Sequence, residues 1–256
     1  MPVYEKAVLN SSKYVLNLIV NRLDKGIVYT DDRYLCMVKR RKDMGNMSVN
    51  KLGGMCLIIG PIMALIFYML QPGNMIIGFA DTADAGASLA SIQSNAMIAS
   101  LCALIIPLGL IMWLNGIRTL SDNGDTSAWG RFGVQFIFIS VIAWVVSIAL
   151  WHGIAAAPAG SDPMAAYTVS AGINNMANVL AAVGVLLFSL SISSREGINK
   201  ILSYIVAITA LVSVVVAIMT LLDPSMSEMS ANIGGVSYII WTIWFILGGL
   251  TLIKQG

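Results

Sequence analysis

The sequence predicts an all-α integral membrane protein. Six transmembrane helices in three hairpins are expected, with both termini in the cytoplasm and an amphipathic, interfacial helical segment ahead of the first span. Two observations predict this fold class. Of the 256 residues, 57% are hydrophobic and 11% are charged, whereas soluble domains carry about 25% charged residues. The basic residues are also confined to alternate connections between the apolar runs.

Six apolar runs account for the spans. Each is close to the roughly 20 residues that cross a bilayer core, and each ends in polar or charged residues. Hydrocarbon leaves no backbone donor without a partner, so each run is expected to be a helix. Pro61 and Pro107 fall inside the first two runs, where they are expected to bend the helix. The expected spans are 52–70, 96–117, 132–151, 176–193, 201–222 and 233–253.

The 15 lysines and arginines all fall on one side of this arrangement. Ten precede the first span. The other five lie between spans two and three, between spans four and five, and after span six: Arg118, Arg131, Arg195, Lys200 and Lys254. The remaining loops, around 71–95, 152–175 and 223–232, contain none. Because cytoplasmic loops retain basic residues, the sequence predicts a multi-pass protein of the cell membrane with its N-terminus and C-terminus inside.

Residues 1–51 are predicted to form a basic cytoplasmic head, ahead of a six-helix bundle over 52–256. Apolar residues recur at helical spacing between residues 8 and 23, which indicates an amphipathic helix along the inner membrane surface. Four consecutive basic residues then precede the first span: Lys39, Arg40, Arg41 and Lys42. We expect them to anchor the head to anionic lipid headgroups, at about 1 kcal/mol per charge. An acidic protein partner is the alternative, and nucleic acid is not expected because no aromatic residues are interleaved.

Chemistry inside the membrane is largely excluded. The six expected spans contain no Asp, Glu, Lys, Arg or His, although an ionisable residue in a span is the usual mark of a functional site. His152 is the only histidine, and one histidine cannot form a bis-histidine haem site or a zinc triad. No phosphate-binding loop, nucleophile elbow or metalloprotease motif occurs. The sequence therefore predicts no catalytic residue, no metal and no cofactor, and bound lipids are expected instead.

The outer rim offers the best candidates for a ligand or ion site. A polar residue follows or ends each outward-running span: Gln71, His152 and Asp223. If the three hairpins are repeats, these residues would lie at a common depth around one outer vestibule. His152 with Asp162 or Asp223 could form a weak cation or proton site, since histidine titrates at about pH 6.5. The alternative is that the acidic rim follows from topology alone, because basic residues are kept inside.

Amides and tryptophans provide a second group of candidates. Asn174 and Asn178 are one helical turn apart at the expected outer start of the fourth span. We expect them to cap the helix or to hydrogen-bond a neighbouring helix, at about 1 kcal/mol or less per bond, with ligand contact as the alternative. Trp144, Trp241 and Trp244 lie deeper in their spans. Packing or lipid contact is expected for these rings, with an aromatic wall for a ligand as the alternative.

Three functions remain open. The first is a non-catalytic accessory or scaffold subunit of a larger membrane complex, bound to other membrane protein subunits. It is favoured because the expected spans contain no ionisable residue and because the predicted cytoplasmic head is substantial. The second is a carrier or channel for a small solute or cation, with an acidic outer vestibule. The third and least favoured is a membrane enzyme, which would need its acids and bases from the loops.

Overall fold

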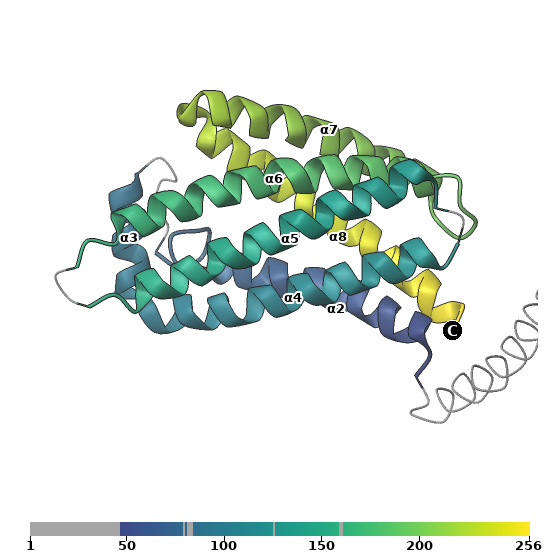
Figure 1. The fold of residues 1–256 in the computed structure, drawn as a ribbon, viewed down its shortest axis with the longest axis horizontal. Coiled ribbons are helices and arrows are strands. Elements are labelled where there is room, and N and C mark those ends of the chain that lie inside the picture. Colours follow the sequence, from purple (N-terminus) through teal and green to yellow (C-terminus); the bar gives the residue numbers. More distant parts are fainter. Residues whose placement is uncertain (1–46, 79, 81–83, 125, 159–160) are drawn as a thin grey trace, which may run out of the picture. The chain divides into compact units, whose positions relative to one another are not determined.

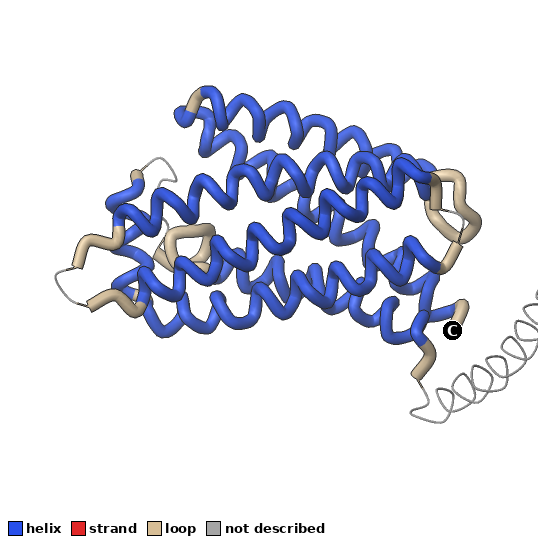
Figure 2. Tube along the Cα trace, viewed as in Figure 1, coloured by secondary structure: helices blue, strands red, loops and turns tan. Residues whose placement is uncertain are grey.

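The computed structural model describes residues 47–256, except 79, 81–83, 125 and 159–160. In this part of the chain every regular element is helical (Figure 2). The elements are a short 3-10 helix (Pro224–Met226) and the α-helices α2 (Val49–Leu70), α3 (Ala85–Ser94), α4 (Ala96–Asp122), α5 (Ala128–Ala155), α6 (Met164–Ile192), α7 (Lys200–Leu222) and α8 (Ser227–Lys254). The predicted interfacial segment and the basic run from Lys39 to Lys42 lie outside the described residues.

Six of these helices are long and apolar enough to cross a membrane: α2, α4, α5, α6, α7 and α8. Only 39–44% of the most apolar window of each is buried inside the bundle. Large apolar side chains therefore cover the outside, such as Ile59 on α2, Leu104 on α4 and Ile208 on α7. An apolar exterior of this extent requires lipid as its solvent. The predicted class, all-α with six spans, is confirmed, and the chain is a multi-pass membrane protein. The sidedness of its termini stays a prediction.

Some helices lie partly or wholly outside the predicted spans. α6 begins at Met164 and α8 at Ser227, whereas the sequence predicts spans from 176 and 233. The helix α3, in the first outer loop, is not predicted at all. The length of an apolar run predicts how much of a helix lies in hydrocarbon. The helix itself can continue past the run, wherever its backbone hydrogen bonds are made. Asn174 and Asn178 therefore lie about three to four turns inside α6 rather than at its start.

Pairs of glycines let the helices approach closely. A Cβ added at Gly60 on α2 would lie 2.7 Å from the carbonyl oxygen of Gly109 on α4. A Cβ at Gly184 on α6 would lie 2.7 Å from the carbonyl oxygen of Gly133 on α5. These contacts leave no room for a side chain, so the backbones of each pair touch directly. Contact of this kind between small residues is a main force between helices in lipid.

The last helix, α8, crosses the bundle obliquely. It starts beside the end of α7 and runs to the end of the bundle where α2 begins (Figure 1). There the two helices are in contact, since a Cβ at Gly249 of α8 would lie 2.7 Å from the carbonyl oxygen of Gly54 on α2. Toward the opposite end a space remains between α8, the end of α2 and the α5–α6 pair, and the candidate site lies in that space.

An aromatic cluster fills the middle of the bundle. The ring of Trp113 on α4 meets Phe245 of α8 edge-on, with 5.3 Å between ring centroids. Phe245 lies 4.9 Å from Trp244, and Trp244 lies 6.1 Å from Phe188 of α6. Each of the four rings is at most 3% exposed. Edge-on and tilted pairs at these distances are favourable for aromatic rings, so the four rings join α4, α6 and α8 in the core.

Candidate functional site

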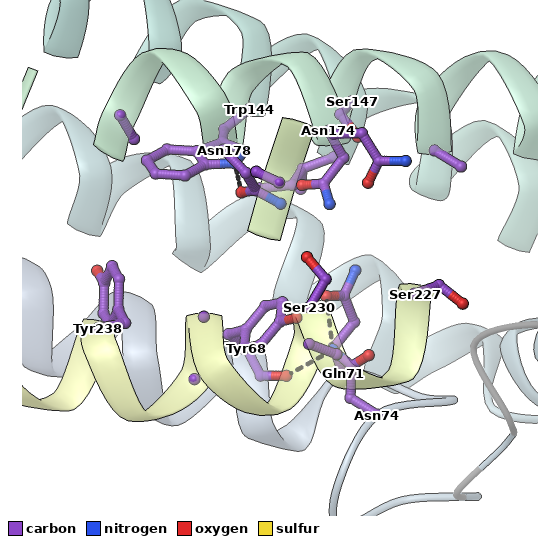
Figure 3. Close-up of a pocket in the computed structure, with 18 of the residues that line it drawn as sticks. Tyr68, Gln71, Asn74, Trp144, Ser147, Asn174, Asn178, Ser227, Ser230 and Tyr238 are labelled. Atoms are coloured by element: carbon purple, nitrogen blue, oxygen red, sulfur yellow. Dashed lines mark hydrogen bonds between the residues drawn. The ribbon is translucent and has the colours of Figure 1, made fainter. Parts of the chain in front are cut away.

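A chamber of about 320 Å³ lies within the bundle, toward the end that carries α3. Figure 3 shows its two main walls: α5 and α6 form one, and α8 with the end of α2 forms the other. Residues of α4 and α7 complete the lining. The loops at this end are those without basic residues, so the predicted topology places the chamber in the outer half. Its volume is typical of pockets that hold small molecules.

The described residues that line the chamber include no charged side chain. Five carry amides: Gln71, Asn74, Asn174, Asn175 and Asn178. Nine carry hydroxyls: Tyr68, Ser88, Ser147, Tyr167, Ser213, Thr220, Ser227, Ser230 and Tyr238. Amides and hydroxyls both donate and accept hydrogen bonds. A charged ligand would lose its hydration here without meeting an opposite charge, so the lining suits an uncharged molecule.

Hydrogen bonds hold the α5–α6 wall together. Trp144 Nε1 on α5 donates to Asn178 Oδ1 on α6 at 3.0 Å. Further along α5, the hydroxyls of Ser147 and Ser170 donate to each other's backbone carbonyls, each at 2.9 Å. Asn178 therefore joins the two helices and fixes the tryptophan ring at the chamber wall.

Asn174, one turn before Asn178, is placed differently. Its side chain makes no hydrogen bond to another described residue, and it points from α6 across the chamber (Figure 3). Ser230 of α8 points back toward it from the facing wall. Its hydroxyl is likewise without a bond in the described chain. This amide and this hydroxyl are therefore available to a ligand.

The turn after α2 closes one side of the chamber. Gln71 is only 4% exposed, and its Oε1 accepts a hydrogen bond from Asn74 Nδ2 at 3.2 Å. Asn74 Nδ2 also donates to the carbonyl oxygen of Tyr68 at 2.9 Å. Between them Gly73 has a φ of 90°, a conformation that glycine adopts without strain. The turn therefore carries Gln71 inward rather than out to solvent.

The α8 wall is bare in the middle and polar at both ends. Ser227, Ser230, Gly234 and Tyr238 follow one another at helical spacing along the face that lines the chamber. No atom lies within 4 Å of a Cβ added at Gly234 or Gly235. At the two ends, Ser227 Oγ and Tyr238 Oη are buried and have no hydrogen-bond partner among the described residues. Such a hydroxyl costs about 1–3 kcal/mol of stability, and the same cost falls on Trp113 Nε1 and Thr242 Oγ1, which are outside the chamber lining.

Aromatic rings form the inner end of the chamber. The rings of Trp144 and Tyr238, which line it, each lie 6.3 Å from the buried ring of Trp113. Trp241 also lines it, and its Nε1 donates to Thr209 Oγ1 of α7 at 3.1 Å. One turn further on, Trp244 packs wholly into the core. Of the three deep tryptophans, two therefore combine packing with a place in the chamber wall.

The other predicted rim residues are not part of the chamber lining. His152 Nδ1 lies 3.2 Å from Ser100 Oγ on the exposed surface. Asp162 Oδ1 accepts a hydrogen bond from the backbone at the start of α6. Asp223 Oδ1 accepts bonds from the hydroxyl and the N–H of Ser225, at 2.7 and 3.0 Å, and these bonds lower the pKa of Asp223. Nowhere in the described chain do three or more His, Cys, Asp or Glu residues form a group that could hold a metal ion.

The predicted candidates therefore divide into two groups. Gln71, Asn174 and Asn178 lie together around one chamber, whereas His152 contacts Ser100 of α4 and the two aspartates make local hydrogen bonds, all outside the chamber lining. Comparison with protein-family models, with curated proteins and with solved structures finds no match for this chain. The chemistry of the chamber is therefore the basis for a functional proposal.

Most of the polar chamber residues are not among the predicted site candidates, including Tyr68, Ser227, Ser230 and Tyr238. Neither hydropathy nor a search for titratable groups identifies serines and tyrosines beside apolar runs as site residues. A signal does exist on α8, where small and polar residues recur every three to four positions. The same pattern also marks contact between helices, so only the structure shows that this face lines a chamber.

Proposed function

We propose that this membrane protein is a carrier that binds a small, uncharged, polar molecule in the chamber. One observation carries the proposal: the described lining combines amides, hydroxyls and aromatic rings with no charge. Amides and hydroxyls can match the donors and acceptors of a neutral solute. A preformed pocket with a few convergent polar groups is also the usual form of a small-molecule site.

The lining favours a neutral solute over the cation that the acidic rim suggests. Cation sites in proteins are built mainly on carboxylate oxygens, and the described lining of the chamber contains no carboxylate. The rim carboxylates Asp162 and Asp223 instead accept hydrogen bonds from neighbouring backbone, outside the described lining. The solute carrier is therefore retained from the sequence hypotheses, with an uncharged solute in place of a cation.

The buried aromatic cluster supports a carrier rather than an open channel. Trp113, Phe188, Trp244 and Phe245 are outside the chamber lining and pack against one another in the core, where each is at most 3% exposed. A carrier opens its site to one side of the membrane at a time. With the predicted topology, this conformation would receive its solute from the outer side.

An accessory subunit, the function that the sequence alone favours, has weaker support from the chamber. A subunit that only holds partners together needs no polar cavity in its apolar interior. Polar side chains that line the chamber without a partner in the described chain, such as those of Asn174 and Ser230, are easier to explain if they serve a bound molecule.

Uptake into liposomes tests the proposal. The full-length chain is purified and reconstituted, and uptake of radiolabelled urea, glycerol and D-glucose is compared with uptake of guanidinium and D-glucuronate, their charged relatives. We expect at least one uncharged solute to enter faster than into protein-free liposomes. The charged solutes should not, because the described lining provides no opposite charge.

Two glycine variants test whether the chamber is the path. Gly234→Leu places a side chain in the chamber, where an added Cβ meets no atom within 4 Å, and should reduce uptake to the protein-free rate. Gly172→Leu on α6 is the matched control, because Gly172 has the same open surroundings but is not part of the lining. Equal uptake by both variants, or no uptake of any uncharged solute, would contradict the proposal.

A further inference from the structure

We infer that the solute is a neutral, polyhydroxylated ring compound of single-sugar size, held between Ser230 on α8 and Asn174 on α6. The inference rests on the proposed function, since it names the class of molecule that the chamber binds. It follows from how hydrogen-bonding groups and bare surface are arranged on the two walls (Figure 3).

The middle of the chamber suits the face of a ring. On α8, Gly234 and Gly235 present only backbone, with no atom within 4 Å of an added Cβ. On the other wall, the ring of Trp144 is fixed by its hydrogen bond to Asn178. The faces of a sugar ring carry mainly C–H groups, which pack against bare backbone and aromatic rings without loss of hydrogen bonds.

Hydrogen-bonding groups surround this bare surface. Ser230 precedes Gly234 by one turn of α8, and Asn174 faces it from α6 (Figure 3). Neither side chain bonds to another residue of the described chain. On the far side of the glycines lies Tyr238, which also lines the chamber. Hydroxyls at the edge of a sugar ring both donate and accept, so they match the Asn174 amide on one wall and the Ser230 hydroxyl on the other.

Other uncharged molecules match these groups less completely. Urea is too small to reach both walls and leaves the bare surface uncovered. A long-chain alcohol covers that surface but has a single hydroxyl, so most of the polar groups would be left without a partner. Sites built to hydrogen-bond their ligand discriminate strongly against molecules that leave such groups unpaired. The volume of about 320 Å³ is at the lower end for small-molecule pockets, which favours a single ring over an oligosaccharide.

Binding to the full-length chain in lipid nanodiscs tests the inference. D-glucose and myo-inositol are titrated, with urea and 1-hexanol as uncharged molecules that lack a hydroxylated ring. Tryptophan fluorescence reports occupancy, because Trp144 and Trp241 line the chamber. We expect saturable binding of at least one of the two ring compounds, and no saturable binding of urea or 1-hexanol.

The variant Ser230→Ala removes one hydroxyl that the ring should contact. We expect its dissociation constant for the ring compound to rise about tenfold, as for the loss of one hydrogen bond to a ligand. Ser194→Ala is the matched control, because Ser194 is exposed and outside the chamber lining, and its affinity should be unchanged. Without ligand, both variants should unfold at the same temperature as the unmodified chain, since the Ser230 hydroxyl makes no bond to a described residue.

The possible results separate the inference from the proposed function. If urea or glycerol enters liposomes through the chamber but neither ring compound binds, the inference is overturned and the carrier function stands. If Ser230→Ala binds the ring compound as tightly as the unmodified chain, the position assigned to the ring is wrong. If no uncharged solute binds or is taken up, the proposed function fails together with the inference.

Discussion

Two asparagines on α6 differ in role because different groups face them. Asn178 accepts a hydrogen bond from Trp144 across the contact with α5. Asn174, one turn away, has no side-chain bond to a described residue and faces the chamber. Both residues are asparagines, and they lie on the same side of one helix. Asn178 therefore contributes to the packing of two helices, and Asn174 is free to contact a solute.

Alanine replacements should separate these two roles. Asn178→Ala leaves Trp144 Nε1 without its acceptor, so we expect the free energy of unfolding in bicelles to fall by about 1 kcal/mol. Asn174→Ala breaks no bond within the described chain and should weaken solute binding at unchanged unfolding free energy. Unfolding by SDS measures the first quantity, and fluorescence titration measures the second. Equal destabilisation by the two variants would show that the division is wrong.

Among the helices, α5 and α6 form the most firmly joined wall of the chamber. Their backbones touch at Gly133 and Gly184. Along the same contact, Ser140 Oγ donates to a backbone carbonyl of α6 at 2.8 Å, and Ser147 and Trp144 add further bonds. Small residues allow the close approach, and the polar side chains then find partners across it. This pair therefore holds Asn174 in a constant position relative to Trp144 and Ser147 of α5.

Alanine at Gly184 should disrupt this contact. The added Cβ would lie 2.6 Å from Ile137 Cγ1 and 2.7 Å from the Gly133 carbonyl oxygen, and backbone cannot move aside as a flexible side chain can. We expect a loss of about 1–3 kcal/mol in unfolding free energy, as for other overpacked sites.

Gly172→Ala is the control on the same helix, since no atom lies within 4 Å of its added Cβ. Its unfolding temperature should be unchanged or slightly raised, because alanine favours the helix more than glycine does. Thermal unfolding of both variants in the same detergent checks the pair. A similar loss of stability in both would mean that the close approach of Gly184 to Gly133 does not decide the effect.

At the scale of the whole molecule, the two ends of the bundle are built differently. At the end where the C-terminus lies, Arg195 donates to the carbonyl oxygens of Leu120 and Asn123, and Thr251 donates to that of Gly197 at 3.0 Å. These bonds tie the connections between helices together. The chamber lies toward the opposite end. Because basic residues gather at the tied end, we expect that end to face the cytoplasm.

Single cysteines test this orientation. In a chain with Cys36, Cys56 and Cys102 replaced by alanine, one cysteine is introduced at Ser161, between α5 and α6, or at Ser194, between α6 and α7; both positions are exposed. On intact cells, a membrane-impermeant thiol reagent should label Ser161→Cys at once and Ser194→Cys only after permeabilisation. The reverse pattern would place the chamber on the cytoplasmic side and contradict the predicted topology.

The parts of the site that could be predicted are those with a local signal. Asn174 and Asn178 stand out because amides beside an apolar run are unusual, and Gln71 because it directly follows a span. Ser230 and Tyr238 carry no such signal, since serine and tyrosine are common at helix contacts and at membrane interfaces. The pairing of His152 with an aspartate is a different case. It depends on distances between loops, which residue types alone do not specify.

By itself, the sequence determined that this chain has six helices in lipid, because moving a side chain into hydrocarbon depends mainly on that residue and its near neighbours. Only the tertiary structure decided which polar groups share a chamber. A hydrogen bond such as that between Trp144 and Asn178, or a backbone contact such as that between Gly54 and Gly249, depends on a partner far away in the chain. The oblique course of α8, which leaves the space that Ser230 and Asn174 face, depends on contacts such as that between Gly54 and Gly249 rather than on hydropathy.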